Sequence, residues 1–419
     1  MTSLPRNAVL LAFEGPDPYS MVGGLGTRVT ELATALAESG VRTTLLFVGD
    51  PSLPAVQQPA RNLEYRRWCQ WISDYHPAGV YDGEREKVND YTASVPPFVV
   101  NEIVEPAAAR GETVLVIAED WQTAPCALAL EVLLRDRGVR DRVALTWNAN
   151  NTYGFDAIDW PALASAAQIT CVSRYMKFEL QARGVESFVI PNGIPQRLLN
   201  GAPKKLVRVA ERIFTLRRPL YVKVARFEEE KRWMQVIEAF AGVAAEHRRA
   251  TLVVRGGREP YGDAVFARAR EMGLEACDLV IGSRDPREVL EAVATAPGNV
   301  INVRSFLPEE ALLALYRVAD AVLANSGREP FGLVGLEVMA AGGVAVTGST
   351  GEDYVQPFEN AIVCDTGDPR ELESYLVELI KHGKLAPAIR KDGRATAERY
   401  TWPHVLKLMA RKLSTTLSP

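Results

Sequence analysis

Two glutamates, Glu329 and Glu337, stand eight positions apart in the segment EPFGLVGLE. The first follows the apolar stretch DAVLA and is expected on a loop at the carboxyl end of a strand. The second should lie about two turns on, inside the helix that follows. Carboxylates accept hydrogen bonds from hydroxyls, and a helix start attracts phosphate, so the spacing suits a sugar nucleotide. Two surface glutamates on an Ala- and Gly-rich helix are the alternative.

Two cations stand at another expected helix start. Arg226 ends the strand-like stretch PLYVKVAR, and Lys231 follows five residues later. Cations oppose the dipole at a helix N-terminus, and a bound diphosphate would remove that conflict. A solvated turn, in which the cations pair with Glu228, Glu229 and Glu230, is an equally good interpretation.

A third candidate is the glycine turn MVGGLG, residues 21–26, between the first expected strand and the first helix. Gly23, Gly24 and Gly26 would let the backbone approach a ligand closely, next to the N–H groups of a helix start. Such a turn after a strand is often no more than a turn.

These candidates fall on loops because apolar runs alternate with helical patterns along the chain. For example, AVLLAFEG precedes GTRVTELATALAESG, in which Val29, Leu32 and Leu36 recur at helical spacing. Continuous β-branched runs between helices indicate parallel strands covered on both faces, which bind ligands beyond their carboxyl ends. We therefore expect an α/β protein with two doubly wound parallel-sheet domains facing across a cleft.

The chain has 419 residues, enough for two domains of about 200 residues each. The Pro- and Gly-rich segment 191–205 is the expected linker, between domains at 1–195 and 205–398. Residues from about 51 to 105, with aromatics among prolines and charges, look like an insertion with short helices. It would be a substrate-side flap or a peripheral packed subdomain.

Composition narrows the class of protein. A net charge of −4 argues against nucleic acid as a partner, and no apolar run reaches the ~18–20 residues of a membrane span. Five scattered cysteines without a C-x-x-C pair indicate neither a disulfide frame nor a zinc site. The four histidines lack metal-ligand spacing, and the N-terminus lacks a signal-peptide pattern. We expect a cytoplasmic protein without a metal or cofactor.

Taken in order, the motifs resemble those of the retaining glycosyltransferases of family 4, which includes relatives of sucrose and glycogen synthase and has the two-domain GT-B fold. The family's E-x7-E element matches EPFGLVGLE, its Arg-x4-Lys pair matches Arg226 and Lys231, and its glycine loop matches GGLG. VIPNGI resembles the start of the family's linker, and ERYTWPHVLKLM resembles a last helix that returns to the N-terminal domain, here 399–419. The resemblance is nearly continuous in the C-terminal half and scattered in the N-terminal half.

The resemblance implies roles for individual residues. Glu329 would bind sugar hydroxyls and Glu337 the ribose, while Arg226 and Lys231 would neutralise the leaving diphosphate. Further donor-binding positions would be the backbone at Phe331, Gly332 and Leu333, the base-pocket residues Gly256 and Leu307, and the phosphate-side glycines Gly24 and Gly26.

Two positions depart from the family pattern. Glycogen synthases carry Lys at the start of the glycine loop, where this chain has Met21, and many relatives carry His where AEDWQTA has Glu119. Glu119 would accept a hydroxyl hydrogen bond, bind an amino acceptor or mark lost activity. The asparagines of TWNANNTYG follow another strand and either face the acceptor or cap a turn; they are Asn148, Asn150 and Asn151.

The resemblance implies metal-independent transfer of a hexose, with glucose favoured, from a nucleoside-diphosphate sugar to a small-molecule or glycan hydroxyl. Two alternatives remain open. One is an inactive nucleotide-sugar-binding regulator or scaffold, and the other is a different enzyme of this fold, such as a phosphorylase or an epimerase.

Overall fold

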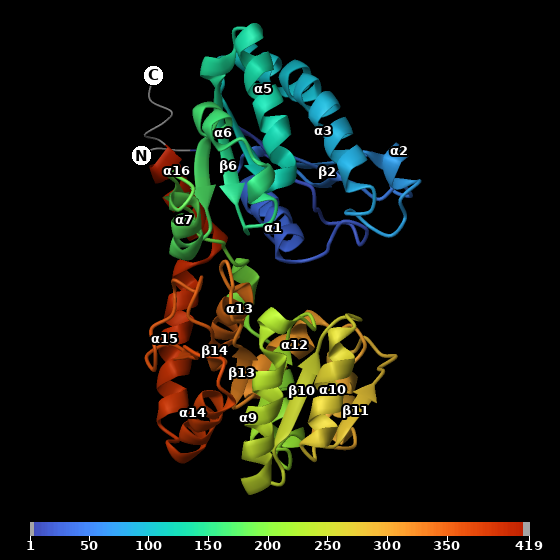
Figure 1. Cartoon of the computed structure of the whole chain (residues 1–419), viewed down its shortest axis with the longest axis vertical. Coiled ribbons are helices and arrows are strands. Elements are labelled where there is room, and N and C mark those ends of the chain that lie inside the picture. Colours follow the sequence, from blue (N-terminus) through green and yellow to red (C-terminus); the bar gives the residue numbers. More distant parts are fainter. Residues whose placement is uncertain (1–3, 414–419) are drawn as a thin grey trace. The chain divides into compact units, whose positions relative to one another are not determined.

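The computed structural model describes residues 4–413, which divide into two compact units. The first comprises the described residues up to Gly193 and those from Thr401 onward, and the second runs from Ile194 to Tyr400. Each unit is a mostly parallel sheet flanked by helices (Figure 1). Helix α16, Trp402–Leu413, belongs to the first unit, and residues 414–419 of the expected final segment lie outside the described part.

The first unit contains an eight-stranded sheet in the order β3-β4-β2-β1-β5-β6-β7-β8. Its neighbouring strands are parallel except β3 and β4. The order reverses at β1, which has β2 on one side and β5 on the other, and doubly wound sheets bind ligands beyond such a reversal. The strands are β1 (Asn7–Leu11), β2 (Arg42–Val48), β3 (Val56–Ala60), β4 (Leu63–Trp68), β5 (Val114–Glu119), β6 (Val143–Ala149), β7 (Gln168–Cys171) and β8 (Phe188–Val189).

The secondary structure of residues 51–105 differs from the expected short helices. The segment holds β3 and β4, which extend the sheet, and a helix of 15 residues, α3 (Glu84–Phe98), instead of short helices only. Every second residue of β4 is buried, as in a strand with one face on the core. The prolines that suggested breaks, Pro96 and Pro97, lie in the last turn of α3, and the chain continues through a π-helical turn, Val99–Val104.

Both ends of the first unit contribute to one hydrophobic core. Leu32 and Leu36 of α1 belong to the same buried cluster as Leu406 and Met409 of α16. Helix α16, red in Figure 1, accordingly lies among the blue and green elements of this unit. The helices are α1 (Gly24–Glu38), α2 (Gln70–Ser73), α3 (Glu84–Phe98), α4 (Glu105–Ala109), α5 (Ala124–Asp136), α6 (Trp160–Ala166), α7 (Arg174–Gln181) and α16.

The second unit contains a seven-stranded parallel sheet in the order β11-β12-β10-β9-β13-β14-β15. Here the order reverses at β9, which lies between β10 and β13, so the loops after β9 and β13 flank the expected ligand position. The strands are β9 (Leu220–Val224), β10 (Thr251–Arg255), β11 (Ala276–Leu279), β12 (Val300–Val303), β13 (Ala321–Ala324), β14 (Ala345–Thr347) and β15 (Ile362–Val363).

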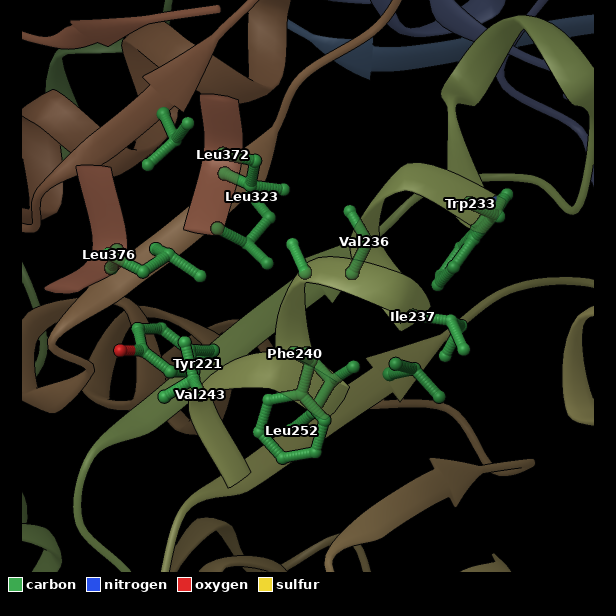
Figure 2. Close-up of a cluster of buried hydrophobic side chains, with 14 of the residues drawn as sticks. Tyr221, Trp233, Val236, Ile237, Phe240, Val243, Leu252, Leu323, Leu372 and Leu376 are labelled. Carbon is green, nitrogen blue, oxygen red and sulfur yellow. The ribbon is translucent and has the colours of Figure 1, made fainter. Parts of the chain in front are cut away.

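The core of the second unit fixes α9 against this sheet. Figure 2 shows Tyr221, Trp233, Phe240 and Leu252 within one buried cluster. Each buried side chain of this size contributes about 1.5–3 kcal/mol relative to exposure, so the start of α9 is held firmly. The helices are α8 (Lys204–Ile213), α9 (Trp233–Glu246), α10 (Tyr261–Glu271), α11 (Pro286–Thr295), α12 (Glu309–Val318), α13 (Leu333–Ala341), α14 (Pro369–Lys381) and α15 (Leu385–Arg399).

Among the described residues, no helix has both the length and the apolar character needed to cross a membrane.

Candidate active site

The loop that carries Glu329 leaves the carboxyl end of β13, beside the reversal of strand order. Gly332 ends this loop with φ of 76°, a left-handed conformation that glycine adopts without strain, and α13 begins at Leu333. Glu337 therefore lies only about one turn into the helix, where two were expected. Within the described residues no side chain caps α13, so its first N–H groups are available to an anionic ligand.

Lys231 and Glu329 form an ion pair at this loop. Lys231 lies in a 3₁₀ turn, Glu229–Lys231, between β9 and α9, and its Nζ is 2.6 Å from Glu329 Oε2. Both side chains are largely buried, with exposed fractions of 19% and 23%. The fold thus joins two candidate residues that are 98 positions apart in the sequence.

Arg226 lies differently. Its guanidinium is half exposed and pairs with Glu228 at 3.0 Å. The charged-turn interpretation therefore describes Arg226, whereas Lys231 has Glu329 as its partner. Exposed ion pairs contribute about 0–1 kcal/mol, so Arg226 could exchange Glu228 for a phosphate at little cost.

The loop that carries Glu329 is held by a buried aromatic ring and by a hydrogen bond of its backbone. The Phe331 ring is buried, with its centroid 5.8 Å from that of Tyr354 and 6.3 Å from that of Tyr400. The Glu329 N–H donates to Thr350 Oγ1 at 2.9 Å. These contacts fix the approach to α13 before any ligand binds.

A buried carboxyl group, Glu352, lies against this loop and was not predicted from the sequence. Its side chain is 4% exposed, and a Cβ added at Gly332 would stand 2.7 Å from its Cγ. Neither carboxylate oxygen has a hydrogen bond of normal geometry within the described residues. Burial, and then the charge of Glu329, raise the pKa of Glu352 to about 8, although the backbone of Glu352 and Thr350 offsets part of this. Glu352 is therefore mostly protonated at neutral pH.

A buried lysine, Lys223, orders the start of the same loop. Its Nζ donates to Asn325 Oδ1 at 2.8 Å and to the Leu323 carbonyl at 3.1 Å. Asn325 Nδ2 in turn donates to Gln235 Oε1 at 2.9 Å. Burial, and then the charge of Lys231, lower the pKa of Lys223 to about 7. In the sequence, the only indication that this lysine has a special role is its charge within the otherwise apolar strand β9.

The expected base-pocket residues occupy two other loops of the second unit. A Cβ at Gly256 would stand 2.2 Å from the Phe227 ring, so this position admits only glycine while the ring stays in place. The N–H groups of Phe227 and Gly257 both donate to Glu259 Oε2 at 3.0 Å, which ties the loop after β10 to the loop after β9. Leu307 is buried at the loop before α12.

The glycine turn of the first unit already holds an anion of the chain itself. Glu14 Oε2 accepts hydrogen bonds from the N–H groups of Gly23 at 3.1 Å and Gly26 at 2.9 Å. Its Oε1 accepts from the Tyr81 hydroxyl at 2.5 Å. Gly24 begins α1, and a Cβ there would meet nothing within 4 Å. A phosphate at these amides would have to replace Glu14, which the sequence interpretation did not consider.

Glu119 ends β5 and is fully buried. Arg28 Nε lies 3.2 Å from both of its carboxylate oxygens, and Oε2 also accepts from Asn148 Nδ2 at 2.9 Å and Asn150 Nδ2 at 2.6 Å. The structure thus brings Glu119 together with two of the three asparagine candidates. The described contacts of Glu119 are thus all to groups of the protein itself.

Asp120 organises the remaining asparagine. Its Oδ2 accepts from Asn151 Nδ2 at 2.7 Å, and its Oδ1 accepts from the Asn150 N–H at 2.8 Å. Burial raises the pKa of Asp120 to about 7. Its φ of 61° places a non-glycine residue in the left-handed region, where strain is common at functional sites.

We expect replacement of Arg28 by methionine to destabilise the first unit by about 3–5 kcal/mol, because Glu119 would keep a buried charge without its cationic partner. Urea unfolding would measure this as a lower midpoint. The double variant Arg28→Met with Glu119→Gln should recover part of the lost stability, because position 119 then no longer carries a buried charge without a partner. A single variant as stable as the parent chain would contradict the buried pair.

Across residues 4–413, no group of three or more His, Cys, Asp or Glu side chains is arranged to hold a metal ion.

Comparison with known proteins identifies a family match in the second unit. Residues 210–396, within the second unit, match the family model described as Glycosyl transferases group 1. A D-inositol 3-phosphate glycosyltransferase of Corynebacterium jeikeium is 25% identical over 187 residues, which cover 43% of this chain and 39% of that protein. An uncharacterized glycosyltransferase of Methanocaldococcus jannaschii is 39% identical over 134 residues, covering 31% of this chain and 34% of the relative. These alignments therefore span well under half of the curated relatives.

Solved structures resemble the chain over nearly its whole length. Sucrose-phosphate synthase from Thermosynechococcus elongatus has a TM-score of 0.69 at 18% identity, covering 98% of this chain and 99% of that one. The catalytic domain of starch synthase IV from Arabidopsis thaliana, bound to ADP and acarbose, has a TM-score of 0.69 at 15% identity, covering 99% and 100%. At such identities the likeness shows the fold alone. The chain thus has the GT-B fold, and residues 210–396 of its second unit match the glycosyl transferases group 1 model.

Proposed function

We propose that this chain transfers a hexose, with glucose favoured, from a nucleoside-diphosphate sugar to a hydroxyl acceptor, with retention of configuration and without a metal ion. The observation that carries the proposal is the pair of Lys231 and Glu329 at the uncapped start of α13. An ammonium, a carboxylate and a helix N-terminus match the diphosphate and the hydroxyls of one donor molecule.

The donor would bind by replacing the ion pair. Sugar hydroxyls would donate to Glu329, and the diphosphate would accept from Lys231 and from the first N–H groups of α13. Cleavage of the sugar–phosphate bond leaves an oxocarbenium-like sugar and places negative charge on the departing diphosphate. Fixed donors aimed at that charge are typically worth about 2.7–4 kcal/mol each in the transition state. Arg226 would turn from Glu228 to the same phosphates.

On the acceptor side, we assign contact to Asn150 and Asn151, and we make Glu119 a positioning residue. Glu119 accepts from Asn150 Nδ2 and is itself held by Arg28, so it orients the amide instead of touching the acceptor. The leaving phosphate would take the proton of the attacking hydroxyl on the same face of the sugar. Curated relatives are named for inositol 3-phosphate and L-malate, which supports a small hydroxyl compound as acceptor alongside a glycan.

Thermal unfolding with UDP, ADP, GDP and TDP, in EDTA and in magnesium, tests the donor site. One diphosphate at about 100 times its dissociation constant should add about 2.7 kcal/mol of stability, with or without metal. Lys231→Ala should lower the affinity for the diphosphate at least tenfold, because the cation facing the diphosphate is lost. The stabilisation at a given diphosphate concentration should therefore be smaller.

Arg287→Ala provides a matched control, because Arg287 is an exposed cation of α11 that pairs with Glu291. It should leave diphosphate affinity unchanged. If no diphosphate stabilises the chain, or if both variants bind equally, the donor site does not lie at Lys231. Product analysis by NMR then distinguishes transfer with retention from binding without turnover.

A further inference from the structure

A cavity of about 620 Å³ lies in the second unit, at the opposite edge of the sheet from the Glu329 loop. Arg218 and Asp320 in its wall directly precede the region where β9 and β13 begin, whereas Glu329 follows the other end of β13. Gly342, also in the wall, ends α13, so the cavity and the donor loop lie at opposite ends of that helix. The cavity is therefore separate from the proposed donor site.

The wall is strongly basic although the chain as a whole carries a net charge of −4. It contains two acidic residues, Glu211 and Asp320, and five basic ones: Arg218, Arg317, Arg390, Lys391 and Arg394. One of the acids is already used, because Asp320 Oδ2 pairs with Arg218 at 2.9 Å. A net excess of positive charge thus remains within one cavity.

Helix capping explains part of this arrangement. Arg390 Nη2 donates to the Ala319 carbonyl at 2.7 Å, and Arg394 Nη1 donates to the Ala340 carbonyl at 3.0 Å. These carbonyls lie at the C-terminal ends of α12 and α13, where cations are favoured by the helix dipole. Capping therefore explains the position of Arg394 and the hydrogen bond made by Arg390 Nη2.

Capping does not account for the other donors. Within residues 4–413, Arg390 Nε is buried without a hydrogen-bond partner. Arg317, which is half-buried, and Lys391, which is exposed, have no hydrogen bond or ion pair among the described contacts. An orphaned buried donor costs about 1–3 kcal/mol, more when it is charged, so Arg390 Nε lacks the acceptor that would satisfy it. Burial, and then the charge of Arg317, lower the pKa of Arg390 to about 10.

We propose that this cavity is a second ligand site, which binds a small phosphate-bearing anion through Arg317, Arg390 and Lys391. Guanidinium groups present paired donors that match phosphate oxygens, and Lys391 adds a point charge. The volume falls within the range of small-molecule sites, about 300–1,000 Å³. The proposal concerns binding alone and does not depend on the donor site.

Isothermal titration of the whole chain with inorganic pyrophosphate tests the proposal, carried out in the parent and in Lys231→Ala. The second background weakens the donor site and leaves the cavity intact. We expect binding in both backgrounds, and at least a tenfold weaker affinity when Arg317→Ala and Lys391→Ala are added to Lys231→Ala. Arg317 and Lys391 lie on α12 and α15 and have no described hydrogen bond or ion pair to lose, so the unfolding temperature should stay unchanged.

Arg248→Ala with Lys407→Ala provides the matched control, because both residues are exposed, lie outside the cavity wall and remove the same charge. Added to Lys231→Ala, the two control substitutions should leave the affinity for pyrophosphate unchanged. Equal weakening in the control would mean general electrostatic attraction and would overturn the site. Loss of all binding in Lys231→Ala alone, or unchanged affinity in the cavity variant, would equally overturn it. A parallel titration with glucose 6-phosphate then shows whether a sugar phosphate binds more tightly than pyrophosphate.

Discussion

Replacement of Glu329 by glutamine is expected to lower the rate of sugar transfer about 100- to 1,000-fold while nucleoside-diphosphate affinity stays equal or rises. Removing one preorganised polar contact to the reacting group typically has this effect on kcat. Glutamine keeps the size of the side chain but loses the charge that faces the sugar hydroxyls. Lys231, which lies 2.6 Å from Glu329, would lose its ion-pair partner and become more available to phosphate. Product formation and diphosphate titration measure the two effects separately.

Glu310→Gln is the control for this variant, because Glu310 is an exposed carboxylate in the first turn of α12 and the charge change is identical. It should transfer sugar at the parental rate. Unchanged turnover in Glu329→Gln would remove Glu329 from the site. A parallel loss of diphosphate affinity would indicate a collapsed loop instead of a lost sugar contact.

Replacement of Glu352 by glutamine is expected to stabilise the second unit by up to about 5 kcal/mol at pH 8 and above, and by little at pH 4.5. The pKa of Glu352 is raised from 4.5 to about 8, and a tenfold change in its acid dissociation constant corresponds to about 1.36 kcal/mol. Below pH 4.5 the carboxyl group is protonated in both the folded and the unfolded chain, so folding loses nothing. As the pH rises towards 8, the unfolded chain ionises first, and folded-state stability falls.

Thermal unfolding from pH 4.5 to 9 measures this difference between Glu352→Gln and the parent. The gap in unfolding temperature should widen as the pH rises from 4.5 to about 8 and then level off, because glutamine cannot ionise. Glu359→Gln, an exposed carboxylate seven positions later, is the matched control and should follow the parent at every pH. A gap that stays constant with pH would mean that Glu352 is ionised in the folded chain.

Much of the fold was predictable because buried parallel strands have a clear sequence pattern. Runs such as AVLLAF and TLVVRG are apolar on both faces, and the structure confirms them within β1 and β10 of two doubly wound sheets. The prediction for residues 51–105 was wrong because β4 buries only alternate residues and α3 contains Pro96 and Pro97. A half-exposed strand and a helix with prolines at its end both weaken the local pattern.

The candidate site was predictable where a motif marks a loop, and unpredictable where a partner comes from elsewhere. Glu329 and Lys231 were both identified, and the fold places them in contact. Arg28 was missed because its partner, Glu119, is 91 positions away, and its only signal was a charge on the apolar face of α1. Glu14 was missed for a similar reason, although its position just after a buried strand could have drawn attention to it.

Helix α16 has a consequence for how the chain is made. The second unit, Ile194–Tyr400, is translated before α16, which completes the core of the first unit. Leu32 and Leu36 therefore meet Leu406 and Met409 only after the intervening second unit has been synthesised. Domains generally fold in order from the N-terminus during synthesis, whereas the first unit of this chain needs a helix from beyond the second unit. We therefore expect the apolar face of α1 to lack part of its cover in nascent chains that do not yet include α16, and chaperones bind exposed apolar surface of this kind.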